Sequence, residues 1–366
     1  MNLSGTTVYV APWAPRDVLL GPLISEFEGP LHVAFDSRRG LESSTRVGDD
    51  TTPTVSSLGL GRGLARDVAV MQRFLSRYTP DAIVVHGSYL CVVAAAALRS
   101  MRSRPRMIAV RHHNRNHHLQ RSRKAVAADK FVSRTADAVI APSLAVAETL
   151  SVEGCPETKI HHIPHGVSLR TLREAEGERL GSADGQEDRT TLRLLAMGRL
   201  DWQKDYVTMF KALASARARG LNFSLQILGD GSAESRRHLS RLSSDIGIED
   251  VLSFCGWVPN PYDYLRRADI LVHTARDEAF GLALVEAMLA RIPVVSTGPG
   301  GAREVLSPWY SWVDAGDDRG VSEHLLGTAH RLETARAHAV EIADLVEAQF
   351  DVSKMTAAHY RVYRGD

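Results

Sequence analysis

The sequence predicts an α/β protein made of two Rossmann-like domains, and three observations support this fold class. The chain has 366 residues, of which 44% are hydrophobic, so it is long enough to fill two ordinary cores. Short apolar runs rich in β-branched residues alternate with helical segments, which is typical of parallel strands covered on both faces. A polar stretch poor in large apolar side chains separates two such series, and we expect the interdomain connection there, over residues 171–191.

The strands are expected where the apolar runs lie. In the first half of the chain these runs cover residues 6–11, 30–35, 81–87, 105–113, 137–143 and 159–166. In the second half they cover residues 192–200, 223–231, 252–258, 269–275 and 292–298. Residues 37–63 show no usable periodicity and are expected to form a long, flexible loop whose role the sequence does not reveal. The predicted domains are residues 1–170 and 192–345, followed by a terminal segment over 346–366.

Composition narrows the class of protein. Acidic and basic side chains balance to a formal net charge of +1, so the chain as a whole gives no sign of a nucleic-acid partner. The three cysteines, Cys91, Cys155 and Cys255, are scattered without metal-ligand spacing, which favours a reducing cytosol. No leader and no run of about 18 apolar residues is recognisable. We therefore expect a cytoplasmic protein, with peripheral contact at the inner membrane face as an alternative.

Residues that follow the predicted strands are candidates for the site, because ligands of open parallel α/β sheets lie beyond the carboxyl ends of the strands. Gly198 and Arg199 follow one such run, and Lys204 comes five residues after Arg199. A planar guanidinium and a compact ammonium suit a diphosphate whose negative charge grows as it leaves. The alternative is two solvated surface cations. Gly229, after the next strand, would let backbone approach a ligand, although a plain tight turn explains it equally well.

Two glutamates, Glu278 and Glu286, lie eight positions apart around an expected helix start. Glu286 falls on the apolar stripe of that helix and should be at least partly buried. An unpaired buried carboxylate costs on the order of several kcal/mol, so it needs sugar hydroxyls or an internal salt bridge. Glu278 comes just before the amides of Phe280, Gly281 and Leu282, which are free to bind an anion. Alternatively, Glu278 merely favours the helix dipole.

The motifs around these residues resemble a known family. The segment "EAFGLALVEAM" holds both glutamates, and "MGRLDWQKD", "LQILGDG", "FCGWV" and "PVVSTGPGGAREV" accompany it in the second half. In the first half, "DAIVVHGS", "ADAVIAPS" and "KIHHIPHGV" look like the family's strand ends. Together they resemble the retaining glycosyltransferases of family 4, also called glycosyl transferases group 1. The resemblance covers about residues 80–345 and is densest in the second half.

The resemblance implies a GT-B fold, in which two Rossmann-like domains face each other across a cleft and a C-terminal helix crosses back to the N-terminal domain. It also implies transfer of a sugar, with retention, from a nucleoside diphosphate sugar to an acceptor hydroxyl, without a metal ion or another cofactor. The donor would be a UDP-, GDP- or dTDP-sugar, and the acceptor a carbohydrate, a natural product or a lipid-linked molecule. The sugar, the nucleotide, the linkage and the oligomeric state stay open.

The resemblance assigns roles residue by residue. Glu286 would contact the ribose hydroxyls, and the backbone of Val258 would lie near the base. Glu278 and His112 would contact the sugar, while Arg199 and Lys204 would hold the diphosphate. The expected catalytic residues are therefore His112, Glu278, Arg199 and Lys204. The remaining residues expected at the donor are Gly198, Gly229, Phe280, Gly281 and Leu282.

The stretch "RHHNRNHHLQRSRK", residues 111–124, carries four histidines and five arginines or lysines directly after a strand. It could bind a metal, although no carboxylate or cysteine is near, or it could be a solvated basic arm. In the family a histidine directly after this strand faces the donor sugar, and here that position is His112, with His113 as the close competitor. Arg111, His113 and Arg115 are then candidates for an acidic acceptor or an anionic membrane.

Three other functions compete with glycosyl transfer. A sugar-nucleotide epimerase shares the GT-B fold, and a two-lobed ligand-binding protein also pairs Rossmann-like domains. A nucleic-acid binder using residues 111–124 has thin support in a neutral chain. The sequence also departs from the family pattern, since His165 replaces the usual asparagine, and Asp205 and Ala279 replace common glycines.

Overall fold

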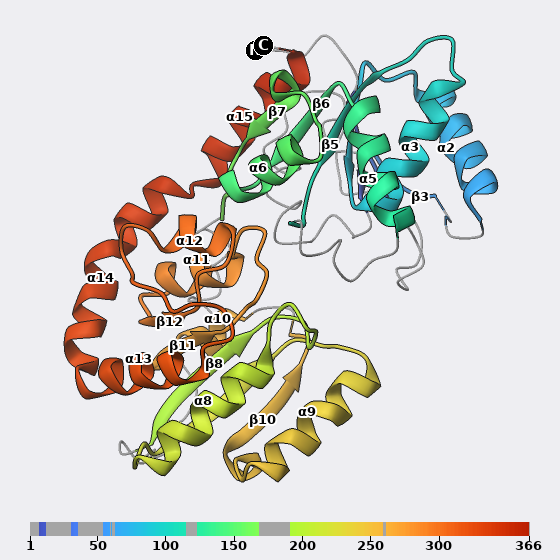
Figure 1. Cartoon of the computed structure of the whole chain (residues 1–366). Helices are drawn as coiled ribbons and strands as arrows, with labels where there is room; N and C mark the ends of the chain where they lie inside the picture. Colours follow the sequence, from blue (N-terminus) through green and yellow to red (C-terminus); the bar gives the residue numbers. More distant parts are fainter. Residues whose placement is uncertain are drawn as a thin grey trace. The chain divides into compact units, whose positions relative to one another are not determined.

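A computed structural model of the chain describes residues 7–11, 31–35, 54–58, 60, 63–114, 123–167, 191–258 and 261–365. The chain divides into two compact units, which we call unit 1 (Met1–Gly166 and Val352–Asp366) and unit 2 (Val167–Asp351). Each unit contains one parallel sheet flanked by helices, which confirms the predicted α/β class (Figure 1). No helix in these ranges is long and apolar enough to cross a membrane.

Unit 1 is built around a seven-stranded parallel sheet with strand order β3-β2-β1-β4-β5-β6-β7. Its strands are β1 (Thr7–Ala11), β2 (Leu31–Phe35), β3 (Thr54–Ser57), β4 (Ala82–His86), β5 (Arg106–Val110), β6 (Ala138–Ala141) and β7 (Ile160–His162). Its helices are α2 (Leu64–Tyr78), α3 (Ser88–Arg99), α5 (Arg123–Thr135), α6 (Leu144–Val152), the short 3₁₀ helix η2 (Glu157–Lys159) and α15 (Val352–Arg364).

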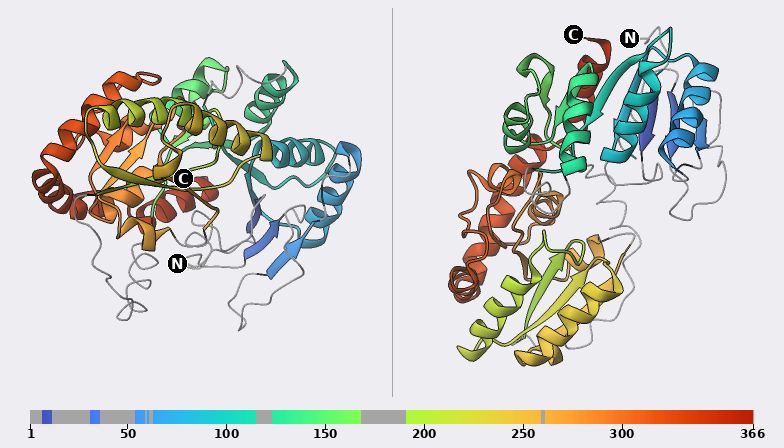
Figure 2. Two further views of the ribbon diagram at one scale, coloured as in Figure 1. Left: turned by 90° about the horizontal axis from the view of Figure 1, so that it is seen from below. Right: turned by 45° about the vertical axis from the view of Figure 1, so that its right-hand side comes forward.

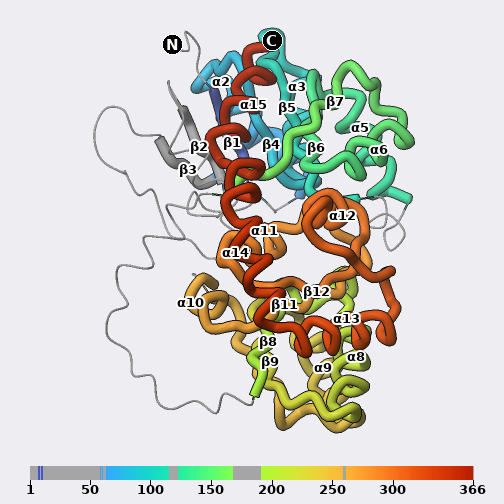
Figure 3. Tube along the Cα trace, turned by 90° about the vertical axis from the view of Figure 1, so that its left-hand side faces the viewer, coloured from blue at the N-terminus to red at the C-terminus, as the bar shows by residue number. Residues whose placement is uncertain are grey.

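Side chains of the central strands alternate between the two faces of this sheet, as in any β-strand. Val84, Ile108 and Ile140 point to the face that α15 covers, where they share a core with Met355 and Val362. Figure 3 shows α15 lying across the strands of unit 1, while α3 contacts α2 and α5 on the other side. The last helix of the chain is therefore part of the first unit.

Unit 2 is built around a five-stranded parallel sheet with strand order β10-β9-β8-β11-β12. Its strands are β8 (Leu192–Met197), β9 (Phe223–Leu228), β10 (Leu252–Gly256), β11 (Ile270–His273) and β12 (Val294–Ser296). Its helices are α8 (Tyr206–Ala218), α9 (Ala233–Asp245), η3 (Glu249–Val251, 3₁₀), α10 (Tyr262–Leu265), α11 (Leu282–Leu289), α12 (Gly301–Leu306), α13 (Asp318–His330) and α14 (Leu332–Gln349).

Two apolar cores cover the two faces of the unit 2 sheet. Helices α8, α9 and α13 pack on one face, and Figure 2 shows α8 and α9 running along it. Helices α11, α12 and α14 pack on the other face, where Leu195, Leu271 and Val294 meet Leu284 and Met288 of α11. Because α11 is buried on this face, any polar side chain on its inner surface is buried as well.

The structure corrects one expectation and leaves another outside its range. Residues 37–63 were expected to form a loop, but Thr54–Ser57 form strand β3, which pairs with β2 in parallel register. The run is only four residues long, and its alternation is too short to stand out from the polar sequence around it. Residues 37–53 and the connection expected over 171–191, except Thr191, lie outside the described residues. The terminal segment expected from residue 346 begins inside α14, which ends at Gln349.

Candidate functional site

Each of three strands of unit 2, β8, β9 and β10, has a glycine at its carboxyl end. The Gly198 N–H donates to the Leu228 carbonyl at 2.8 Å, and the Gly229 N–H donates to the Gly256 carbonyl at 2.7 Å. Gly229 has a φ of +137°, and a Cβ there would lie 2.0 Å from the Gly198 carbonyl oxygen. No residue with a side chain fits at this point. The strands therefore end in glycine backbone, which a ligand can approach closely.

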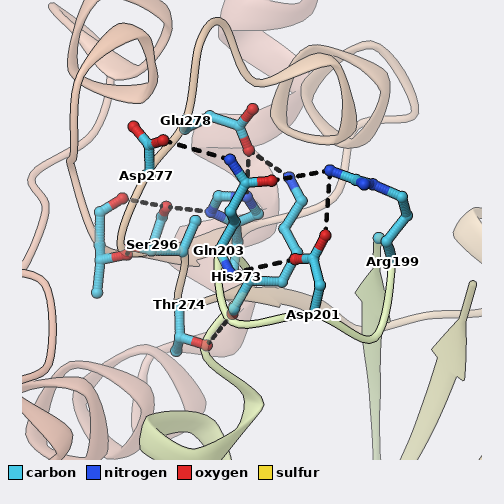
Figure 4. A network of polar contacts seen from close by, with 12 residues as sticks. Arg199, Asp201, Gln203, His273, Thr274, Asp277, Glu278 and Ser296 are labelled. Carbon is cyan, nitrogen blue, oxygen red and sulfur yellow. Dashed lines mark hydrogen bonds and ion pairs between the residues drawn. The ribbon is translucent and has the colours of Figure 1, made fainter. Parts of the chain in front are cut away.

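Glu278 lies just after β11, beside the same edge, and forms an ion pair with Lys204. The Glu278 carboxylate also lies 3.1 Å from Nε2 of His273, the last residue of β11 (Figure 4). Burial raises the pKa of Glu278, but the charge of Lys204 and the hydrogen bond from His273 outweigh it and hold this pKa well below its usual value. Since an ionised carboxylate only accepts, Nε2 of His273 carries the proton.

Arg199 lies at the more exposed side of the same group of residues. Its guanidinium pairs with Asp201 at 3.0 Å and donates to Gln203 Oε1 at 2.8 Å. Gln203 in turn donates from Nε2 to Asp277 at 3.3 Å, so the amide links Arg199 to the loop that carries Glu278 (Figure 4). The side chain of Arg199 is 72% exposed, whereas that of Lys204 is 19% exposed. The two cations therefore share one network, in which Lys204 is the inner group.

The loop that holds Lys204 is fixed by its next residue, Asp205. Asp205 has a φ of +46° and caps α8 by accepting from the Thr208 amide at 3.3 Å. It also pairs with Arg276, and the Thr274 hydroxyl donates to the Lys204 carbonyl at 3.2 Å. A left-handed conformation explains why glycine is common in the family at this position, and aspartate is among the side chains that tolerate it.

Helix α11 begins next to Glu278 without a side-chain cap. Its N-cap is Gly281, with a φ of +114°. The Phe280 side chain is buried in the core against Phe350, with ring centroids 5.6 Å apart, so only its backbone can contribute to a site. Gly301 donates to the Glu278 carbonyl at 2.9 Å, and a Cβ on Gly301 would lie 2.3 Å from the Ala279 carbonyl oxygen. The glycines of "GPGG" thus allow α12 to pack closely against the start of α11.

Glu286 is buried on α11 with only 8% of its surface exposed. None of the described residues forms a hydrogen bond or an ion pair with its carboxylate, so they provide no internal salt bridge. Burial raises the pKa of Glu286 from 4.5 to about 7. A carboxylate in such a place is costly to ionise unless a ligand supplies hydrogen-bond donors.

The end of β10 presents an unusual surface. Val258 is half-buried against the core that contains α11, and the Trp257 side chain before it is 73% exposed. An indole exposed to this extent beside a strand end offers a flat apolar face to a ligand.

The strand ends of unit 1 bring histidines together. His112 follows β5, and its Nε2 lies 2.9 Å from Nδ1 of His86, the last residue of β4. The two rings are stacked with centroids 5.1 Å apart, and His165 stacks on His112 from 5.6 Å. His165, which replaces the usual asparagine, therefore becomes part of this histidine cluster.

All three imidazoles are neutral at pH 7. Burial lowers the pKa of His112 from 6.5 to about 4. Burial and then the neighbouring imidazoles hold the pKa of both His86 and His165 well below 6.5. His359 of α15 interacts electrostatically with the same group, and burial lowers its pKa to about 3. A neutral imidazole can donate from one nitrogen and accept at the other.

Arg111 and His113 face other partners than His112 does. The Arg111 guanidinium is buried and pairs with Glu153 at 3.0 Å and Asp129 at 3.7 Å. His113 contacts the same Asp129 at 3.0 Å. Two of the three residues considered for the acceptor, Arg111 and His113, therefore belong to an internal charge network. The third, Arg115, lies outside the described residues.

Several residues of these sites were missed in the sequence. His273, Gln203 and Asp277 complete the network of Lys204 and Glu278, and His86 contacts His112. A usable signal existed for His86 and His273, because each is the one polar residue at the end of an otherwise apolar strand. Within the described ranges, no group of three or more His, Cys, Asp or Glu side chains is arranged to hold a metal ion.

Comparison with known sequences matches segments of both units to families of glycosyltransferases. The family described as "Glycosyl transferases group 1" matches residues 182–330, and "Glycosyltransferase Family 4" matches residues 31–171. A D-inositol 3-phosphate glycosyltransferase of Pseudarthrobacter chlorophenolicus is 31% identical over 183 residues, which are 49% of this chain and 43% of that protein. A lipopolysaccharide core biosynthesis mannosyltransferase of Rhizobium leguminosarum is 28% identical over 66% of this chain and 68% of its own. The first match thus spans less than half of the relative's length.

Two solved structures illustrate the similarity of fold. HepE from Anabaena, in complex with UDP and glucose, superposes with a TM-score of 0.78 at 16% identity, over 99% of this chain and 100% of that one. Sucrose-phosphate synthase from Thermosynechococcus elongatus has a TM-score of 0.80 at 17% identity, over 98% of each chain. At such identities the likeness concerns the fold.

Proposed function

The chain belongs to the glycosyl transferases group 1 and has the GT-B fold, and from this premise we propose that it moves a sugar from a nucleoside diphosphate sugar to an acceptor hydroxyl with retention of configuration. Unit 2 would bind the donor at the carboxyl edge of its sheet. The buried, unpartnered carboxylate of Glu286 is the observation that carries this proposal, because it needs hydrogen-bond donors that the described residues do not supply.

The two hydroxyls of a ribose would satisfy this carboxylate. Hydroxyl groups donate to carboxylate oxygens in short, charge-assisted hydrogen bonds. With two donors in place, the ionised form of Glu286 becomes favourable, and its pKa falls back from about 7. Next to it, the backbone of Val258 would contact the base, and the exposed indole of Trp257 is free to pack against it.

The diphosphate would lie between Lys204, Arg199 and the uncapped start of α11. Lys204 is already held by Glu278, and Arg199 is tethered through Asp201 and Gln203. Phosphate binding would add negative charge to this network, where the Gly281 and Leu282 amides and the positive end of the helix dipole also favour an anion. We propose that these groups neutralise the leaving diphosphate without a divalent cation.

The sugar would contact Glu278 and His112. In unit 2 the ionised Glu278 accepts hydrogen bonds from sugar hydroxyls, while the neutral His112 of unit 1 can donate or accept one. We propose His112 rather than His113 for this role, because His113 is engaged with Asp129.

In the reaction, the bond between the anomeric carbon and the diphosphate oxygen breaks, and its electron pair stays on that oxygen. The acceptor hydroxyl oxygen forms the new bond to the same carbon, and its proton leaves with the diphosphate. Negative charge therefore develops on the leaving oxygens, and in this proposal Lys204 and Arg199 stabilise that charge in the transition state.

The acceptor is proposed as a hydroxyl-bearing sugar, polyol or lipid-linked glycan. Relatives support this range, since they include an inositol phosphate glycosyltransferase, lipopolysaccharide core enzymes and a mannosylfructose-phosphate synthase. The HepE complexes contain UDP or UDP-glucose, which supports a nucleotide sugar as donor and leaves UDP, GDP and dTDP to be compared.

A donor panel tests the proposal. UDP-, GDP- and dTDP-sugars are added to the wild-type chain and to Glu286→Gln, and the melting temperature is measured. One donor class should stabilise the wild type, by about 2.7 kcal/mol at 100 times its dissociation constant, and should stabilise the variant less. Turnover of the donor without any acceptor would instead favour an epimerase. A panel in which no nucleotide sugar binds would contradict the proposal.

A further inference from the structure

A cavity lies in unit 1, between the C-terminal end of α3 and one side of α5, and has a volume of about 720 Å³. Helix α3 begins after the carboxyl end of β4, and α5 ends just before β6 starts (Figure 1). The residues that line the cavity therefore place it at the amino edge of the sheet. His86 and His112 lie at the opposite, carboxyl edge. The cavity is therefore separate from the proposed sugar site.

Four cations and an apolar floor line this cavity. The cations are Arg99, Arg104, Lys130 and Arg134, and none of the lining residues is acidic. The apolar residues that line it are Leu98, Met101, Ala127 and Phe131. A cavity of this size matches those that bind small organic ligands.

Two of the cations already have partners within the protein. Arg104 pairs with Asp137 at 3.1 Å and donates to the Thr135 carbonyl at 2.7 Å. The Arg99 guanidinium lies 5.9 Å above the ring of Phe131. Lys130 and Arg134, which are both exposed, form no ion pair with any residue that the structure describes.

Basic residues near the end of a helix often serve only to complement its dipole. Here other groups satisfy the last carbonyls of α5. The Lys159 ammonium donates to the Arg134 carbonyl at 3.2 Å and to the Ala136 carbonyl at 2.7 Å. The Thr135 hydroxyl donates to the Phe131 carbonyl at 2.8 Å. The charges of Lys130 and Arg134 are therefore not needed to cap the helix.

We propose that this cavity binds an anionic amphiphile, in which a phosphate contacts Lys130 and Arg134 and an apolar group lies on Phe131, Met101 and Leu98. Guanidinium and ammonium groups on adjacent turns of one helix can both reach a single phosphate. The apolar floor distinguishes such a ligand from a simple inorganic anion. A phospholipid head with the upper part of its chains and a soluble phosphorylated metabolite with an apolar group share this chemistry.

The test uses the full chain and needs neither sugar donor nor acceptor, so its outcome is independent of the proposed function. Monomeric dihexanoyl phosphatidylglycerol and inorganic phosphate are titrated by calorimetry, and vesicles of phosphatidylcholine with or without phosphatidylglycerol are sedimented with the protein. The variant is Lys130→Glu/Arg134→Glu. The matched control is Arg237→Glu/Arg241→Glu, which reverses two exposed charges at the same spacing on α9 of unit 2.

The short-chain lipid should bind the wild type and the control variant with similar affinity, and should bind the Lys130/Arg134 variant at least about 10-fold more weakly. The wild type should also bind this lipid more tightly than it binds inorganic phosphate. If vesicles containing phosphatidylglycerol also sediment the protein, and the variant abolishes this, the ligand is a membrane lipid. If vesicles fail but the monomer binds, the ligand is soluble. Equal losses in both double variants would indicate general electrostatics and, like absence of binding to the wild type, would overturn the proposal.

Discussion

An ion pair lies at the carboxyl edge of the unit 2 sheet, whereas a stack of neutral imidazoles lies at the same edge of the unit 1 sheet. In unit 2, Lys204 and Glu278 form an ion pair, and the pKa of Glu278 is held low. In unit 1, burial keeps His112 and His86 uncharged at pH 7. Both edges are formed by the carboxyl ends of buried parallel strands, so the difference arises from the side chains at and just after these strand ends.

This difference fits the two parts of the proposed substrate. A diphosphate develops charge as it leaves, and fixed charges stabilise that change more than they stabilise the ground state. A sugar presents hydroxyls, which neutral groups bind without the cost of burying an extra charge. Substitutions at the two edges should therefore change different kinetic constants.

The largest effect is expected from Lys204→Ala. The variant removes the cation that we propose as the inner partner of the diphosphate, and it leaves the largely buried Glu278 without its ion pair. Turnover should fall by about 10² to 10³-fold, comparable to the loss of one preorganised transition-state donor. Initial rates and donor affinity are measured together. Lys211→Ala, an exposed lysine on α8, is the control and should keep wild-type rates.

Lys204→Arg sharpens this test. If Lys204 acts as a charge, arginine should recover much of the turnover, although its larger planar group will not reproduce the contact with Glu278. Wild-type turnover in Lys204→Ala would show that the ion pair with Glu278 is only structural. The charged edge would then have no special part in the reaction.

The next largest effect is expected from His112→Ala in unit 1. Turnover should fall by about 10²-fold while the affinity for the nucleoside diphosphate alone stays near the wild-type value, because we propose that His112 contacts the sugar and not the diphosphate. Calorimetry with the diphosphate and initial rates with the full donor separate the two constants.

His113→Ala is the control for His112. It removes a contact with Asp129 and should lower stability more than turnover. If His113→Ala proves to be the more damaging change for turnover, the assignment of the two histidines is reversed. If neither change matters, the histidine cluster has no role in transfer.

Glu286→Gln should produce a smaller loss, seen in binding. The amide keeps the shape but loses the charge, so donor affinity should fall by about 1 to 3 kcal/mol. In the ligand-free wild type, the raised pKa of Glu286 adds stability that is fully present below pH 4.5 and is lost as the pH rises to about 7. The glutamine variant lacks this dependence.

The difference between the two pH profiles isolates this effect. His112 acts in the opposite direction, since its lowered pKa contributes stability above pH 6.5 that is lost as the pH falls to about 4. Because both proteins contain His112, its contribution cancels when the free energies of unfolding are subtracted. From pH 4.5 to 7 the wild type should lose about 3 kcal/mol relative to the variant. Parallel profiles would show that Glu286 is ionised at an ordinary pKa.

The sequence was sufficient to predict where the charged and the histidine-bearing edges lie, but not how their side chains pair. Strand positions follow from short apolar runs, and Arg199, Lys204, Glu278 and His112 were singled out because they come after such runs. The contact of Lys204 with Glu278 joins residues 74 positions apart, and that of His86 with His112 joins residues 26 apart. Local periodicity carries no information on such pairs, because they depend on which strands are neighbours in the sheet.

Local sequence also did not show which charged side chains are buried inside the protein. Arg111 lies in the most basic stretch of the chain, which suggested an exposed arm, yet it is buried between Glu153 and Asp129. The short strand β3 was hidden in a polar segment and is stabilised by its pairing with β2. Both outcomes depend on tertiary neighbours rather than on local sequence.

The smallest effect is expected from Asp205→Gly, and it tests whether every charge in the unit 2 network serves the ligand. Asp205 is next to Lys204 in sequence, but its carboxylate caps α8 and pairs with Arg276, so we expect a structural role. Glycine accepts the φ of +46° without strain, which offsets the lost cap, and the free energy of unfolding should change by less than about 1 kcal/mol. Asp205→Ala should cost about 2 kcal/mol, since alanine neither caps the helix nor tolerates the left-handed conformation. Urea unfolding measures both values, and donor affinity should stay unchanged in each variant. A drop in donor affinity with unchanged stability would show that Asp205 takes part in ligand binding. The charges at this edge could then not be separated into ligand-binding and structural groups.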